Sequence, residues 1–136
     1  MQKRYRLRTD AQFRRVRGTG RSWAQPLAVL YALPNGEGVN RVGFSVSKRV
    51  GNAVTRNRAK RLLREAVRQQ WHTIKPGYDL LLIARAPIAA ATCAEVSAVV
   101  GQLLQRARLQ VTPAAGQTER PAQSRPAEGE VGGQGQ

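Results

Sequence analysis

Residues 41–68 combine three features in one continuous stretch: a predicted strand, a loop that contains glycine, and a long basic helix. Apolar residues alternate with small or charged ones over residues 41–47, and this period of two predicts a strand with one apolar face. Helical periodicity follows, from a predicted N-cap at Thr55 to about Trp71. The stretch therefore predicts a strand followed by a helix at the centre of the fold.

The predicted helix has two different sides. Lys60, Arg64 and Arg68 are spaced four residues apart in a basic stripe, and like charges at this spacing repel one another. Because the helix has a single acid, Glu65, a polyanion such as a phosphate backbone would relieve the repulsion. A solvated helix face is the alternative, which the basic character of the whole chain disfavours. The apolar stripe, which should face a core, consists of Ala59, Leu62, Leu63, Ala66 and Val67.

Charge divides the chain into two parts. Residues 1–109 hold 21 basic and five acidic residues, a net charge of +16, and such an excess in a small domain points to nucleic acid. We expect this part to be an RNA-binding α/β domain that begins with a basic arm, residues 1–8. Residues 110–136 are rich in Pro, Gly and Gln, lack aromatic residues and carry a net charge of −1. They cannot bury enough apolar surface to offset their ordering entropy, so we expect a disordered tail.

The remaining elements indicate an α+β domain. Thr9 with Gln12, and Thr92 with Glu95, have the spacing of capping boxes that begin helices. A turn at residues 34–36 should join the strands before and after it into an antiparallel pair. A strand on each side of the basic helix suggests that the sheet is partly parallel. We therefore predict a small sandwich-like domain with a mixed sheet and the order α-β-β-α-β-α, with strands at residues 26–33, 41–47 and 78–84 and a last helix at about 92–109.

The sequence lacks the groups that a protein nuclease needs, namely clustered carboxylates for metal ions or a histidine-based acid–base pair. His72 is the only histidine, and its place near a helix end suits a surface or capping residue. The acids stand singly, and Glu65, with arginines one turn away, should form a salt bridge. Cys93 is the only cysteine, which excludes an intramolecular disulfide and a multi-cysteine zinc site. We therefore expect no catalytic residue, no metal and no other cofactor on the protein.

Nothing in the sequence indicates export or a membrane. No apolar run approaches the roughly 18 residues of a membrane-spanning helix, and no apolar segment follows the basic N-terminus as in a secretory signal. A single cysteine suits a reducing compartment. We expect a cytoplasmic protein with no membrane partner.

A motif around the start of the basic helix resembles a known signature. Gly51-Asn52-Ala53-Val54, Arg56-Asn57-Arg58, Lys60-Arg61 and Arg64-Glu65 follow one another. This series resembles the signature of the bacterial ribonuclease P protein subunit, the small basic protein that assists a catalytic RNA in trimming the 5′ leader from precursor tRNA. The resemblance spans about residues 3–108 and also includes Arg4, Leu7, Phe13, Leu30-Tyr31, Arg41-Val42-Gly43, Ser45-Val46-Ser47-Lys48 and Ala84-Arg85.

The resemblance implies two binding surfaces, a left-handed strand–helix–strand crossover, and catalytic magnesium ions on the RNA subunit. The motif face and the loop beside it would bind the catalytic RNA, through Lys48, Arg49, Arg56, Asn57, Arg58, Lys60, Arg61 and Arg64, to which the helical stripe adds Arg68. A cleft between the first helix and the sheet would bind the leader of precursor tRNA, through Phe13, Arg17, Tyr31, Gly43 and Ser45.

The expected leader cleft leaves alternatives open. Core positions are the alternative for Phe13 and Tyr31, although the hydroxyl of Tyr31 favours the edge of a cleft. Arg17 stands where the family often has a second aromatic residue, so this cleft would stack fewer bases and contact more phosphates. Gly43 and Ser45 would leave room for an RNA strand.

We therefore expect the protein subunit of ribonuclease P, an endoribonuclease ribonucleoprotein whose catalytic groups are on its RNA. Its partners would be the catalytic RNA, with one protein per RNA, and precursor tRNA. The alternative is a general RNA-binding or ribosome-associated module without a role in tRNA processing. The missing acids disfavour a third class, a self-sufficient nuclease.

Overall fold

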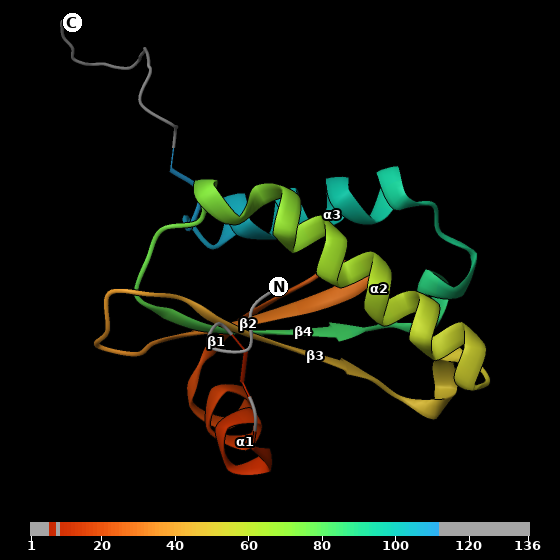
Figure 1. Cartoon of the computed structure of the whole chain (residues 1–136), viewed down its shortest axis with the longest axis horizontal. Helices are drawn as coiled ribbons and strands as arrows, with labels where there is room; N and C mark the ends of the chain where they lie inside the picture. Colours follow the sequence, from red (N-terminus) through yellow and green to blue (C-terminus); the bar gives the residue numbers. More distant parts are fainter. Residues whose placement is uncertain (1–5, 8, 112–136) are drawn as a thin grey trace, which may run out of the picture.

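The computed structural model describes residues 6, 7 and 9–111, which form three layers with a sheet in the middle (Figure 1). Helix α1 lies on one side of the sheet, and helices α2 and α3 cover the other side. Short 3-10 turns join the elements of the described chain: η2 (Lys48–Val50), η3 (Trp71–Thr73) and η4 (Ala86–Ala90). The helices and strands are α1 (Asp10–Thr19), β1 (Arg21–Ala24), β2 (Ala28–Pro34), β3 (Arg41–Val46), α2 (Ala53–Gln70), β4 (Tyr78–Ala84) and α3 (Cys93–Arg106).

The sheet has four strands in the order β1-β2-β4-β3. Strands β3 and β4, which flank α2 in the sequence, run parallel. Strand β2 runs antiparallel to both of its neighbours, β1 and β4. The sheet is therefore mixed, and the predicted α+β class is confirmed.

The predicted antiparallel pair of residues 26–33 with residues 41–47 is wrong, because β4 lies between β2 and β3. Strand β4 occupies the centre because it is apolar toward both faces: five of its seven residues are buried and the other two are half-buried. The connection from β2 to β3 passes the beginning of β4, where the Asn35 N–H donates to the Gly77 carbonyl at 2.9 Å.

Strand β1 has no signal in the sequence that would have predicted it. It has four residues, three of them exposed, and only Trp23 packs against the core. Arg21 lies over the ring of Trp23, 5.5 Å from its centroid. An edge strand this short shows no alternation of apolar and polar residues, so period-based reading misses it.

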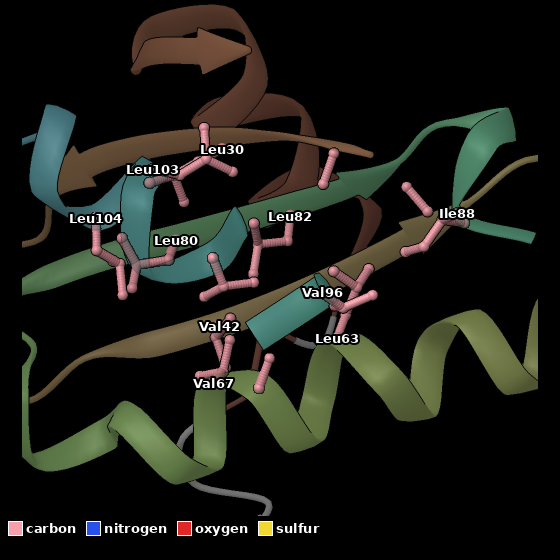
Figure 2. Packing of buried hydrophobic residues seen from close by; sticks show 14 of the residues in the cluster. Leu30, Val42, Leu63, Val67, Leu80, Leu82, Ile88, Val96, Leu103 and Leu104 are labelled. Atoms are coloured by element: carbon pink, nitrogen blue, oxygen red, sulfur yellow. The ribbon is translucent and has the colours of Figure 1, made fainter. Parts of the chain in front are cut away.

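The larger core lies between the sheet and helices α2 and α3 (Figure 2). Leu63 of α2 and Leu103 of α3 are both 0% exposed and share this core with Leu30 and Leu80 of the sheet. Full burial of one such side chain stabilises a fold by about 1.5–3 kcal/mol. Four of the five residues in the predicted apolar stripe of α2 are buried, and Leu62 is half-buried, so the stripe is confirmed.

Helix α2 begins at a different cap from the one predicted. Asn52, and not Thr55, is the N-cap, and its side-chain oxygen accepts the Thr55 N–H at 2.9 Å. Asn is at least as good an N-cap as Thr, and Asn52 starts the helix three residues earlier than predicted. The capping boxes predicted at Thr9 and Thr92 are both present.

Helix α1 packs on the other face of the sheet over a smaller core of Leu7, Val16 and Leu81. The ring of Phe13 covers Gly43 so closely that a Cβ at that position would lie 2.8 Å from Phe13 Cζ. The same Cβ would lie 3.2 Å from Leu7 Cβ. The missing side chain of Gly43 therefore lets α1 approach the sheet.

Both ends of the described chain are tied to the fold. Arg6 pairs with Val42 in a parallel bridge, and Gln110 pairs with Ile74 in an antiparallel one. The Val111 N–H donates to the Thr73 carbonyl at 2.6 Å. The rest of the predicted basic arm and of the predicted tail, residues 1–5, 8 and 112–136, lies outside the described residues.

Two glycine substitutions should have opposite effects on the stability of α1 packing. Gly43→Ala should destabilise the fold by about 1–3 kcal/mol, because the new methyl group overpacks against Phe13 and Leu7. Gly18→Ala should stabilise it by about 0.5–1 kcal/mol, because Gly18 is helical and nothing lies within 4 Å of its Cβ position. Urea unfolding of both variants measures the two effects, and equal stability of Gly43→Ala and the parent would contradict the packing described.

Candidate nucleic-acid interface

The outer side of α2 carries the basic residues of the motif. Asn57, Lys60 and Arg61 are exposed, and within the described chain neither Lys60 nor Arg61 has a side-chain hydrogen bond or ion pair. Arg56 and Arg64 are half-buried, and the Nε atom of each is buried without a hydrogen-bond partner among the described residues. Their terminal nitrogens remain the part of each guanidinium that can meet an anion. The helix thus presents cations that the protein itself leaves unneutralised.

Arg58 differs from its neighbours because it bonds to the protein. Its two terminal nitrogens donate to the carbonyls of Ala91 at 2.8 Å and Ala89 at 3.4 Å, in and just after η4. The predicted role of Arg58 was RNA contact alone, and the structure adds a structural role, which is to hold η4 against the first turns of α2.

Arg68 forms an ion pair with Glu65 one turn earlier, as expected for that acid. The Arg68 Nε donates to Glu65 Oε2 at 3.0 Å. This hydrogen bond lowers the pKa of Glu65 below its ordinary value and raises that of Arg68. Arg68 is therefore already partly neutralised, and of the predicted stripe it is the residue least available to a phosphate.

The loop before α2 adds two exposed cations, Lys48 and Arg49, in η2. Arg49 also lines an open pocket of about 620 Å³ together with Ser47 and Arg85. Arg85 follows β4, and its side chain donates to the Gln25 carbonyl at 3.4 Å. Sequence reasoning did not place Arg85 in a binding surface, and only the parallel pairing of β3 with β4 brings it beside Arg49.

The predicted leader-binding residues gather on the α1 face of the sheet. Tyr31 lies opposite Leu81, which lies opposite Gly43 on the next strand, and Ser45 follows two residues later on the same face. Phe13 and Tyr31 are half-buried and pack against the same small core. Arg17 is exposed in the last turn of α1.

Gly43 does not leave the open space that the sequence suggested. The Phe13 ring and Leu7 already cover it, so Gly43 is buried. The half-buried Tyr31, Ser45 and Ile83 are the accessible part of this face beyond α1.

An ion pair between the buried Asp79 and the partly exposed Arg41 lies at one end of the same face. Asp79 is 1% exposed and accepts two hydrogen bonds from Arg41, at 2.8 and 2.9 Å, and one from Asn35 at 3.0 Å. The hydrogen bond with Asp79 raises the pKa of Arg41 above its ordinary value. Asp79 therefore has a structural role, and Arg41 does not add to the cations that an RNA can neutralise.

In the described part of the chain, no three His, Cys, Asp or Glu side chains come together as a metal site would require. No helix in it is long and apolar enough to cross a membrane.

A sequence model of the family described as Ribonuclease P matches residues 1–108 of this chain. The chain belongs to the ribonuclease P protein family. The ribonuclease P protein component of Roseiflexus castenholzii is 47% identical over 108 residues, which cover 79% of this chain and 88% of the relative. The component of Roseiflexus sp. strain RS-1 is 44% identical over 120 residues, 88% of this chain and 98% of the relative.

Solved structures of ribonuclease P proteins have the same fold. The Staphylococcus aureus protein superimposes with a TM-score of 0.72 at 34% identity, over 78% of this chain and 97% of that one. The Thermotoga maritima protein gives a TM-score of 0.69 at 28% identity, over 74% and 96%. The family resemblance and the fold class predicted from the sequence are thus confirmed, and membership of this family implies an RNA partner and a role in tRNA processing.

Proposed function

We propose that this protein binds the catalytic RNA of ribonuclease P through the outer side of α2 and the 5′ leader of precursor tRNA through the α1 face of the sheet. The observation that carries the proposal is the exposed, unpaired cationic surface of α2, formed by Lys60 and Arg61 with the terminal nitrogens of Arg56 and Arg64. A phosphate backbone is a polyanion that can neutralise several such cations at once.

The leader assignment is supported by the residues that share the α1 face. An aromatic ring at Tyr31 can stack a base, and Arg17 can meet a phosphate of the same strand. With Gly43 covered, the strand would cross Tyr31, Ile83 and Ser45 and would not lie against Gly43 itself. Leader contact belongs to precursor tRNA alone, so this surface would favour precursor over mature tRNA.

Catalysis in this proposal is assigned to the RNA, which would hold the magnesium ions, and the complex would act in the cytoplasm with one protein per RNA. Three of the five acids of the folded part have other roles: Asp79 and Glu65 are paired with arginines, and Glu95 caps α3. The protein would contribute charge and positioning, which raise substrate affinity without a chemical step.

Arg61→Ala should weaken binding to the catalytic RNA and reduce the slope of log affinity against log salt by about one unit, because one phosphate contact is lost. The fold should be unaffected, since Arg61 is exposed on α2. Lys75→Ala is the matched control, because it removes one exposed cation from the turn before β4, away from α2. Equal slopes for Arg61→Ala and the parent across a salt series would refute the docking assignment.

Tyr31→Ala should reduce the preference for precursor over mature tRNA about tenfold, because base stacking on an aromatic ring contributes about 1–3 kcal/mol per base. Tyr31→Phe, which keeps the ring, should retain most of the preference. Affinity for the catalytic RNA should be unchanged in both variants, and circular dichroism should confirm that both fold. An undiminished preference in a folded Tyr31→Ala variant would place the leader elsewhere.

The polypeptide alone, supplied with magnesium, should not cleave precursor tRNA, whereas its addition to the catalytic RNA should lower the substrate concentration needed for cleavage. Gel analysis of end-labelled precursor tRNA measures both results. Cleavage at the mature 5′ end by RNA-free protein would overturn the assignment of catalysis to the RNA.

A further inference from the structure

Val54 is the most exposed large apolar residue in the described part of the chain, at 77%, against 44% for Val39 and 40% for Val111. It lies in the first turn of α2, and helical spacing places Asn57, Arg58 and Arg61 on the same side three, four and seven residues later. A single exposed valine is common on protein surfaces. The surroundings of Val54 therefore decide whether it has a function.

Turn η4, which lies beside the first turns of α2, also exposes small apolar residues. Four of its five residues are exposed, all of them alanine or proline, while Ile88 is 0% exposed and anchors the turn. The hydrogen bonds from Arg58 to the carbonyls of Ala89 and Ala91 hold η4 beside the first turns of α2 (Figure 1). We call the exposed apolar residues of these two neighbouring segments the apolar flank, and they are Val54, Ala86, Pro87, Ala89 and Ala90.

We propose that the apolar flank contacts an unpaired nucleotide of the same structured RNA that binds the basic side of α2. The inference rests on the proposed function. Because Val54 and Arg61 lie on the same side of α2, an RNA that neutralises Arg61 would also bring its atoms against Val54. A phosphate pressed against Val54 would lose water without gaining a hydrogen bond, which is unfavourable. A base face or a ribose is apolar enough to pack there.

The nucleotide must lie outside a duplex. In an A-form helix the base faces are stacked on one another and cannot be reached, whereas loops, bulges and ends expose them. An apolar contact of this kind is not screened by salt, so it adds a salt-independent part to an interface otherwise dominated by counterion release. The effect of salt on binding therefore distinguishes a contact made by the apolar flank from one made by the neighbouring cations.

Val54→Ala should weaken binding of the catalytic RNA about threefold to tenfold at every salt concentration, from the loss of two methyl groups, and should leave the salt slope unchanged. The variant should fold at least as well as the parent, because alanine has a higher helix propensity than valine. Val39→Ala is the matched control: it removes the same methyl groups from another exposed valine, in the connection between β2 and β3, and should bind as the parent does.

Failure of the Val54 contact can be distinguished from failure of the proposed RNA docking through α2. Parental affinity of Val54→Ala at all salt concentrations would overturn the apolar contact, while the slope of Arg61→Ala would still report on the docking surface. A slope reduced by about one unit in Val54→Ala would also overturn it, since the loss would then be of a phosphate contact.

Cross-linking tests which nucleotide is contacted. A photoreactive group attached to Val54→Cys, in a Cys93→Ala background because Cys93 is exposed, should react with an unpaired position of the catalytic RNA. Reaction confined to base-paired stems, or no reaction with the RNA in a complex that still forms, would overturn the proposal.

Discussion

The position of β4 between two layers is the constraint on which the rest of the fold depends. Because helices cover both faces of the sheet, the central strand must be apolar in both directions, and its three consecutive leucines, 80 to 82, are each 2% exposed. Asp79 is the exception, and its carboxylate is matched by Arg41, its direct neighbour on β3. A shift of β3 would leave the buried Asp79 carboxylate without its partner, so the pair favours this register of β3.

The elements that could be predicted from the sequence are those whose signals are local. The capping boxes at Thr9 and Thr92 and the apolar stripe of α2 depend on residues within a turn or two, and the structure has all of them. Strand order could not be predicted in this way. The turn after β2 suits a hairpin, but the two-sided burial of β4, about 40 residues later, excludes it. The short strand β1 is held in place by its pairing with β2, and its own residues show no alternation of apolar and polar side chains.

In the candidate site, too, positions within one element could be predicted from the sequence, whereas contacts between separate elements could not. Helical spacing groups the cations of α2 correctly, since one helix determines their relative positions. Spacing does not reveal that Arg58 is bonded to η4, that Gly43 lies under Phe13, or that Arg85 comes beside Arg49. Each of these contacts joins residues from separate elements, and each changes how a residue can serve in binding.

The net charge of the folded part therefore overstates the number of phosphates that it can neutralise. Arg41 and Arg68 are paired with acids, and Arg58 donates to backbone carbonyls, so much of their hydrogen-bonding capacity is used within the protein. Their charges still contribute to the long-range field that attracts a polyanion and raises its rate of encounter. Cations without an acidic partner, such as Lys60 and Arg61, displace counterions from the phosphates that they contact, and the number of such contacts determines how steeply affinity falls with salt. A strongly basic protein of this kind can thus have fast association together with a salt dependence smaller than its charge suggests, which leaves room for contacts of other kinds to decide where on an RNA it binds.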